Sequence, residues 1–246
     1  MRVALAVPCY VDRLRPQAAR ATLALLERLG CEVSLAFDAA CCGQPMFSAG
    51  AVSAARGASA AWAEASRGFD AIVMPSGSCT HHVRHHLASV VKGAAADHAA
   101  RVTYELCEFI AGPLGRPTLP GRFPHTVAMH LGCHAQRGLR LGGSSEMHRP
   151  LDGPMHALLA GLDGLAFATL DRPDECCGFG GSFAVGEPEV SVSMGRDKIA
   201  DVTRHGAEVL VSSDPSCLLH LEGVATHGRS PLRTLHIAEL LEEATR

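Results

Sequence analysis

Aromatic residues are scarce in this chain, at 4% of 246 residues, so its core must be built mainly from smaller side chains such as alanine, leucine and valine. No charge of one sign dominates, because the formal net charge is −3 and the isoelectric point is near 6.5. Proteins that bind nucleic acids usually carry a basic patch or stripe. We therefore expect no nucleic-acid partner.

Long hydrophobic runs are also missing. A membrane-spanning helix needs about 20 consecutive apolar residues, and no stretch of the chain approaches this length. The apolar run at residues 5–7 is too short for the core of a signal peptide. We expect no membrane span and a cytoplasmic location, where the 10 cysteines would serve as ligands or catalysts rather than form disulfides.

Two patterns that would indicate other cofactors are absent. The glycine-rich segment 178–181 lacks the G-x-G-x-x-G spacing after a strand, so we expect no nucleotide or flavin bound by this chain itself. The chain also has no C-x-x-C knuckle, the usual element of a structural zinc site. This disfavours zinc.

A paired-cysteine motif is present twice. Residues 41–45 read CCGQP, and residues 174–183 read DECCGFGGSF. The glycine after each pair, Gly43 or Gly178, can adopt a positive φ without a Cβ penalty, so both sulfurs can face one point. Gly180 and Gly181 leave backbone N–H groups accessible to an anionic, sulfur-rich group.

The elements around the two motifs repeat in the same order. We expect strands at residues 3–7, 31–37 and 71–74, and again at 126–130, 165–169 and 209–211. We expect helices at residues 17–29, 53–66, 80–91, 155–160 and 190–205, with Gly68 and Gly206 ending equivalent helices. Residues 112–124 are typical of a linker. These features predict an α/β fold with two similar parallel-sheet units, 1–115 and 116–246, that arose by internal duplication and are related by a pseudo-two-fold axis.

Each predicted unit has cysteines in the order single, pair, single. The two sets are Cys9, Cys41, Cys42, Cys79 and Cys133, Cys176, Cys177, Cys217. The single cysteines follow apolar strands and precede or open helices, which places them at the carboxyl ends of parallel strands, where ligands bind. Helix N-termini there favour thiolate over thiol. Four converging thiolates can hold either an iron–sulfur cluster or zinc, and the doubled pattern favours clusters over buried apolar cysteines.

The pattern resembles the cysteine-rich CCG domain, which is found twice in one component of heterodisulfide reductase and in the iron–sulfur component of glycolate oxidase. It is most similar to the single-chain lactate utilization protein A group. The resemblance is carried by VPCY at residues 7–10, CCGQP at 41–45, PSGSC at 75–79, ECCGFGG at 175–181 and SDPSC at 213–217. These stretches span nearly the whole chain.

The resemblance implies one iron–sulfur cluster per repeat, bound by the eight motif cysteines. In heterodisulfide reductase a fifth cysteine follows the last one by three residues and completes a non-cubane cluster. In this chain, those places hold His82 and His220. The resemblance thus leaves open a cubane 4Fe-4S cluster with four cysteines and a site with an additional histidine ligand.

The family likeness also implies a function. It indicates an iron–sulfur electron-transfer subunit, inactive alone, of a complex that oxidises lactate or a similar 2-hydroxy acid such as glycolate to the 2-oxo acid. The partners would be a larger ferredoxin-type iron–sulfur subunit and a further subunit. Two alternatives are a cluster-based thiol–disulfide reductase subunit of the heterodisulfide type and a zinc-stapled scaffold without redox activity.

Several other residues favour structural roles. Cys107 aligns internally with Ala238, and Cys31 has no counterpart, so both are predicted to lie in the core. A histidine tract is expected at the solvated surface, unless His82 is a ligand; it comprises His81, His82, His85 and His86. A charged helix face is expected there as well, formed by Arg196, Asp197 and Lys198. His130 and His134 flank Cys133, and we expect buried histidines with satisfied hydrogen bonds there.

Overall fold

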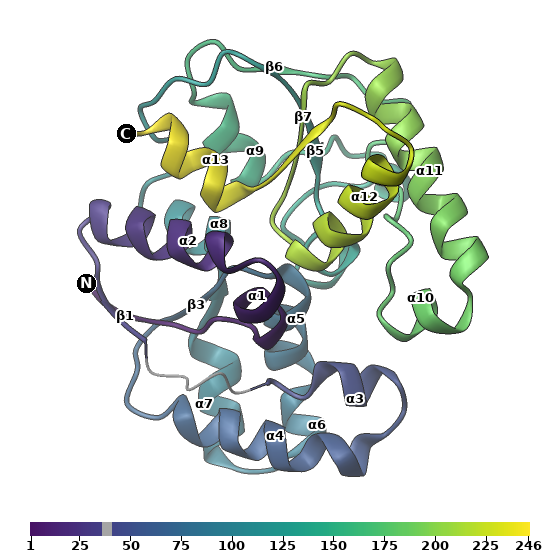
Figure 1. Ribbon diagram of the computed structural model, residues 1–246. Coiled ribbons are helices and arrows are strands. Elements are labelled where there is room, and N and C mark those ends of the chain that lie inside the picture. Colours follow the sequence, from purple (N-terminus) through teal and green to yellow (C-terminus); the bar gives the residue numbers. More distant parts are fainter. Residues whose placement is uncertain (36–40) are drawn as a thin grey trace.

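The computed structural model describes residues 1–35 and 41–246 and contains two four-stranded, all-parallel sheets (Figure 1). The strands of the first sheet are β1 (Arg2–Leu5), β2 (Glu32–Ser34), β3 (Ile72–Met74) and β4 (Thr103–Glu105). Those of the second are β5 (Thr126–His130), β6 (Ala166–Phe167), β7 (Val209–Ser212) and β8 (Arg233–His236). The predicted α/β class with parallel sheets is confirmed.

Both sheets have the same strand order. The order is β2-β1-β3-β4 in the first and β6-β5-β7-β8 in the second, which confirms the duplication. In each sheet the second strand of the half lies on one side of the first strand, and the third and fourth strands lie on its other side. The switch point therefore lies between the carboxyl ends of β1 and β3, or of β5 and β7, and ligands of open α/β sheets bind at such points.

Helices cover both faces of each sheet. In the first half they are α1 (Cys9–Leu14), α2 (Pro16–Arg28), α3 (Gln44–Ser48), α4 (Val52–Ala65), α5 (Gly77–His85), α6 (Leu87–Val90), α7 (Ala94–Val102) and α8 (Leu106–Ala111). In the second half they are the π-helical turn η1 (His134–Gly138), the 3-10 turn η2 (Ser145–Met147), α9 (Pro154–Ala160), α10 (Ser182–Gly186), α11 (Pro188–Arg204), α12 (Pro215–His227) and α13 (Ile237–Ala244). Among the described residues, no helix is both long and apolar enough to cross a membrane.

Most predicted elements occur within a few residues of their expected bounds, with two exceptions. The helix predicted at residues 80–91 is divided at His86, where the backbone leaves helical geometry, into α5 and α6. The predicted strand at 31–37 is present as β2 over Glu32–Ser34, and residues 36–37 of that prediction lie outside the described part of the chain.

The two halves share one hydrophobic core. Helix α2 of the first half packs against α13 of the second, and α8 of the first packs against α9 of the second. The buried side chains include Leu25 and Leu26 of α2, Phe109 of α8, Leu158 of α9 and Leu240 of α13. Because α2 and α9 follow the first strand of their halves, while α8 and α13 follow the last, the two contacts are equivalent under a two-fold operation. The halves thus pack as pseudo-symmetric copies. The boundary between residues 115 and 116 itself stays a prediction.

Candidate metal centres

The first four cysteines meet at the switch point of the first sheet. Cys9 begins α1 directly after β1, and Cys79 lies in the first turn of α5 directly after β3. Neighbouring thiols influence one another here, because the pKa of Cys41 depends on Cys9 and Cys42, and the pKa of Cys42 depends on Cys41 and Cys79. The four sulfur atoms are thus neighbours in the folded chain, although the cysteines are distant in sequence.

The second four cysteines repeat this arrangement. Cys133 precedes η1 after β5, and Cys217 lies in the first turn of α12 after β7. The same pairs of thiols influence each other's pKa: Cys133 with Cys176, Cys176 with Cys177, and Cys177 with Cys217. The connectivity of sulfur contacts is the same in both halves, so each predicted set of four is brought together by the fold.

The glycine after each cysteine pair allows the loop to turn back on its sulfur. Gly43 has a φ of 94° and Gly178 a φ of 92°, as the sequence predicts. The N–H of each glycine donates to the first sulfur of its pair, Cys41 or Cys176, at 3.4 Å. A Cβ on Gly178 would lie 2.5 Å from the carbonyl oxygen of Ser191. Only glycine satisfies both the backbone conformation and this close approach.

One cysteine in each set is held as a thiolate. Hydrogen bonds from the thiols of Cys42 and Cys9 lower the pKa of Cys41, and those from Cys133 and Cys177 lower the pKa of Cys176. The same hydrogen bonds raise the pKa of the donating thiols. Thiolates are the form in which cysteine ligates soft metal ions, so each set presents donor atoms suited to a metal, whose binding would release protons.

Two histidines lie against these sets with neither ring nitrogen hydrogen-bonded to any described residue. His82 of α5 and His130 at the end of β5 are each only 1% exposed. A nitrogen of His130 and the sulfur atoms of Cys177 and Cys217 all lie within 4.8 Å of one another. Burial and the neighbouring His86 lower the pKa of His82 to about 4, and burial and the charge of Lys198 lower that of His130 to about 3. Both imidazoles are therefore neutral at pH 7.

This finding changes two expectations. His82 was expected on a solvated face of the tract, but it is buried; His130 was expected to be a satisfied core histidine, but it has no partner among the described residues. Buried polar atoms are nearly always paired in native proteins, and unpaired ones mark a strained, functional or ligand-binding position. His130 thus marks a nitrogen donor close to the sulfur atoms of Cys177 and Cys217, and His82 is a buried imidazole within electrostatic reach of Cys41.

The other predicted histidine ligand is placed differently. His220 lines the cavity beside the second set, but its Nε2 lies 3.1 Å from the carbonyl oxygen of Ser191. His134, after Cys133, lies with its Nδ1 3.9 Å from the Cys133 sulfur. Its ring is 5.1 Å from that of His81, which connects η1 of the second half to the histidine tract of α5 in the first.

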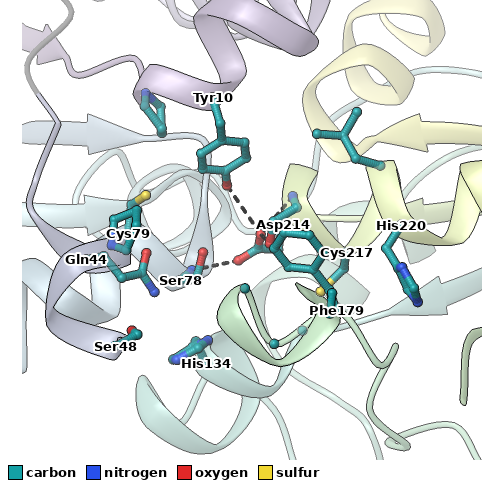
Figure 2. A pocket seen from close by; sticks show the side chains of 18 of the residues that line it. Tyr10, Gln44, Ser48, Ser78, Cys79, His134, Phe179, Asp214, Cys217 and His220 are labelled. Carbon is teal, nitrogen blue, oxygen red and sulfur yellow. Dashed lines mark hydrogen bonds between the residues drawn. The ribbon is translucent and has the colours of Figure 1, made fainter. Parts of the chain in front are cut away.

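All eight motif cysteines line one cavity of about 670 Å³ between the two halves. Figure 2 shows Tyr10 and Asp214 between Cys79 of the first set and Cys217 of the second. The cysteines differ in exposure: Cys133 is exposed and Cys9, Cys41 and Cys176 are partly exposed, whereas Cys42, Cys79, Cys177 and Cys217 are buried. The two sets therefore face a common, solvent-connected space. Cys31 and Cys107 are buried away from it, in the shared core, as predicted.

Two buried side chains of α11, Lys198 and Asp201, hold the backbone of the loop before the second cysteine pair. Lys198 was expected on the solvated face of this helix, but it is fully buried. Its ammonium group donates to the carbonyl oxygens of Arg172 and Pro173, at 2.8 and 2.9 Å. Asp201, one helical turn later, accepts the N–H groups of Asp171 and Arg172. Helix α11 thereby determines where the Cys176–Cys177 pair begins.

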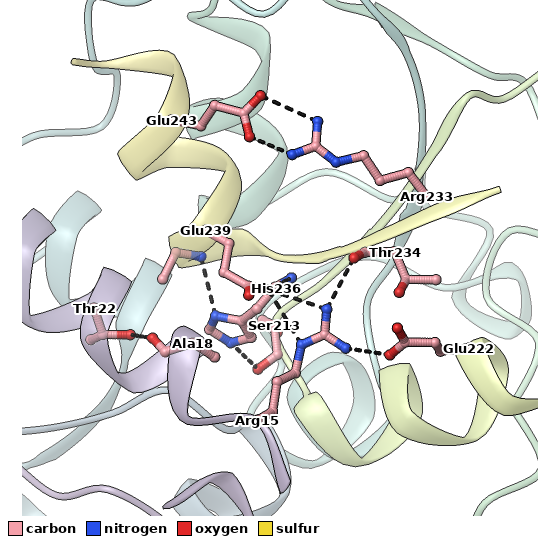
Figure 3. A network of polar contacts seen from close by, with 11 residues as sticks. Arg15, Ala18, Thr22, Ser213, Glu222, Arg233, Thr234, His236, Glu239 and Glu243 are labelled. Carbon is pink, nitrogen blue, oxygen red and sulfur yellow. Dashed lines mark hydrogen bonds and ion pairs between the residues drawn. The ribbon is translucent and has the colours of Figure 1, made fainter.

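The loop before Cys217 is supported from behind by a buried network (Figure 3). His236 Nε2 lies 3.4 Å from the carbonyl oxygen of Ser213, and its Nδ1 accepts the N–H of Ala238 at 3.2 Å. Glu239 accepts the N–H of His236 at 2.7 Å and forms an ion pair with Arg15 of the first half at 3.3 Å. The second centre is thus held in part by a residue of the first half.

The fold and the two cysteine centres define the class of the protein. The family model of the cysteine-rich domain, CCG, matches residues 3–84 and 127–222, so one copy covers each centre. The chain therefore belongs to this family.

Within the family, the chain is similar to proteins named lactate utilization protein A. It is 37% identical to that of an Exiguobacterium species over 99% of this chain and 98% of the relative. It is also 37% identical to that of Bacillus subtilis, over 98% and 99%, and 33% identical to lactate utilization protein A 1 of Bacillus mycoides, over 99% and 97%. The chain therefore falls in the lactate utilization protein A group.

Proposed function

We propose that the chain holds two iron–sulfur clusters, one in each half, and transfers electrons in a system that oxidises lactate or a similar 2-hydroxy acid. The main observation is the pair of four-cysteine sets with identical sulfur connectivity at two equivalent switch points. The names of the relatives support lactate as the substrate of the system. A cluster, when bound, supplies reversible one-electron chemistry.

The donor atoms fit such a cluster better than they fit zinc. Structural zinc sites are closed, with the metal enclosed by four ligands. Here each set combines buried sulfur atoms with partly or fully exposed ones that face an open cavity. We assign Cys9, Cys41, Cys42 and Cys79 to the first cluster, and Cys133, Cys176, Cys177 and Cys217 to the second. His82 and His130 are assigned as the adjoining nitrogen donors.

The residues of the chain have separate tasks in this proposal. The N–H groups of Gly43 and Gly178 stabilise charge on Cys41 and Cys176. Cys79 and Cys217 lie in the first turns of α5 and α12, where the positive ends of the helix dipoles would stabilise the negative charge of a bound cluster. Electrons pass to or from partner proteins, a larger ferredoxin-type iron–sulfur subunit and a further subunit, in the cytoplasm. The chain alone is then expected to be inactive toward lactate.

A second candidate function follows from the shared cavity. Because all eight cysteines face one open space, a disulfide substrate would reach both clusters there, as in a heterodisulfide-type reductase. Turnover by the complex assembled from purified partners separates the two functions. Oxidation of lactate without reduction of a disulfide supports the first, and the opposite result supports the second.

The test of cluster binding is anaerobic purification followed by analysis of iron and acid-labile sulfide. The wild-type chain should be brown, and Cys42→Ser or Cys177→Ser should each lose roughly half of the iron, because each affects one cluster. The matched control is Cys107→Ala, since Cys107 is equally buried and its internal counterpart is Ala238. A colourless protein that contains zinc would overturn the proposal, and so would equal iron loss in the control.

A further inference from the structure

One carboxylate between the two centres is bonded to both halves. Asp214 is the N-cap residue of α12, and its Oδ1 accepts the backbone N–H of Ser216 at 3.1 Å and the Ser216 hydroxyl at 2.6 Å. Its Oδ2 accepts the backbone N–H of Ser78 in α5 of the other half, at 2.7 Å (Figure 2). A single side chain therefore stabilises the N-terminal turns of the two helices that carry Cys79 and Cys217.

The equivalent position in the first half holds a serine. Ser76 is the N-cap residue of α5, three residues before Cys79, just as Asp214 is three residues before Cys217. The two N-cap side chains face each other: the Tyr10 hydroxyl lies 2.8 Å from the Ser76 hydroxyl and donates to Asp214 at 3.4 Å. Two carboxylates in these places would repel each other and disfavour ionisation. The two halves therefore differ at this N-cap position, where the first half has the neutral Ser76 and the second half has Asp214.

Asp214 is only 2% exposed, so its charge is weakly screened by water. Its oxygens accept the backbone N–H groups of Ser216 and Ser78, the residues directly before Cys217 and Cys79. The Tyr10 hydroxyl, which donates to Asp214, belongs to the residue directly after Cys9. The carboxylate therefore lies within electrostatic reach of the second set directly and of the first set through Ser78 and Tyr10.

We propose that the carboxylate of Asp214 is a fixed negative charge shared by both metal centres, which lowers the reduction potential of each. Reduction adds one electron to a centre that already carries thiolate charge, and a nearby buried carboxylate disfavours this step. The inference rests on the proposed function, because it requires clusters at both sites. It assigns Asp214 as a positioning and charge-bearing residue rather than a ligand.

The experiment is a redox titration of the cluster-loaded full chain with dithionite, followed by electron paramagnetic resonance. Asp214→Asn removes the charge and keeps an oxygen acceptor. Both midpoint potentials should rise, the second centre more than the first, while the iron and sulfide contents stay at the wild-type level. Backgrounds of Cys177→Ser and Cys42→Ser assign the signals, because each leaves one centre intact.

Two further variants separate charge from hydrogen bonding. Tyr10→Phe removes the hydroxyl contacts with Ser76 and Asp214 but keeps the carboxylate, so neither potential should rise. Asp214→Ser gives α12 the N-cap residue that α5 has in Ser76 and removes the charge, so both potentials should rise as in Asp214→Asn; this variant decides the question if Asp214→Asn does not assemble. The proposal is overturned if only one centre responds, or if Tyr10→Phe raises both potentials. Failure of the wild-type chain to take up iron would instead overturn the proposed function.

Discussion

The two unpaired histidines show how the centres differ at the scale of single residues. His82 comes from the helix that carries the last cysteine of its set, whereas His130 comes from the strand before the first cysteine of the other set. The internal counterpart of His82 is His220, which has a carbonyl partner instead. The imidazole thus occupies different positions in the two halves, although the cysteine positions match. We expect the two centres to have distinct spectra.

Replacing His130 with alanine should weaken retention of iron in the second half about 10- to 100-fold, the usual cost of removing a residue that supports metal ligands. His220→Ala should leave it nearly unchanged, because the Nε2 of His220 lies beside the carbonyl oxygen of Ser191. The measurement is the rate of iron loss to a chelator in the Cys42→Ser background, where only the second centre remains. Faster loss in His220→Ala than in His130→Ala would reverse the assignment.

At this scale the sequence predicted the cysteines and named His82 and His220 as possible additional ligands, but it did not predict the role of His130 or the buried charges. The repeated order of cysteines is visible in the chain and independent of side-chain packing. His130 and Lys198 gave no such signal, because burial of a polar side chain depends on which helix covers it. The only sequence clue to His130 was its place at the end of an apolar strand, three residues before Cys133.

At the scale of elements, each half ends in a short strand that leads directly into a capped helix. Glu105 caps α8 in a reciprocal arrangement with Glu108, and His236 caps α13 in the same way with Glu239. The sequence alignment of these segments was correct, but neither β4 nor β8 was recognised as a strand. Both are only three or four residues long and merge with the following helix, so periodicity could not identify them.

The cap of α8 predicts a pH dependence of stability. Burial raises the pKa of Glu105 to about 8 from its usual value of 4.5, so the folded chain binds a proton more tightly than the unfolded chain between these values. Glu105 therefore stabilises the folded chain fully below pH 4.5, and this stabilisation is lost as the pH rises toward 8. The free energy of unfolding should fall by at most about 1.4 kcal/mol per pH unit across this range.

Glu105→Gln tests this dependence, because glutamine keeps an acceptor and does not ionise. The free energy of unfolding of the metal-free chain, measured in urea, should fall less steeply with pH in the variant than in the wild type between pH 4.5 and 8. Parallel curves for the two proteins would show that Glu105 does not titrate in this window.

At the scale of the whole molecule, the buried Arg15 connects the halves. It is 3% exposed and forms ion pairs with Glu222 at 2.7 Å and Glu239 at 3.3 Å, and it donates to the carbonyl oxygen of Thr234 at 3.0 Å (Figure 3). All three partners belong to the second half. Arg28, at the other end of α2, also pairs with α13, but it is far more exposed.

Arg15→Met should lower the free energy of unfolding by about 2–4 kcal/mol, because the change leaves the largely buried carboxylate of Glu239 without its partner. Arg28→Met, on the same helix, should cost only about 0–1 kcal/mol, since exposed ion pairs contribute little. Urea unfolding at constant pH gives both values. Similar losses in the two variants would contradict a special role of Arg15 in joining the halves.

The duplication and the parallel sheets were predictable from the sequence, since matching strands, glycine stops and cysteines recur in order. How the copies face each other was not, because the shared core depends on α2, α8, α9 and α13 meeting in space. The single cavity and the cross-half bonds of Asp214 follow from that packing. No local pattern in the chain encodes them.

The reciprocal packing of α2 on α13 and of α8 on α9 has the geometry of an isologous dimer interface, in which the same patch of each partner meets its copy. In a homodimer of identical repeats, both facing N-cap positions must hold the same residue, either two hydroxyls or two repelling carboxylates. A single covalent chain is free of that constraint. Asp214 opposite Ser76 is an arrangement that only the fused form can have, so joining the repeats into one polypeptide permits the two centres to share one charge.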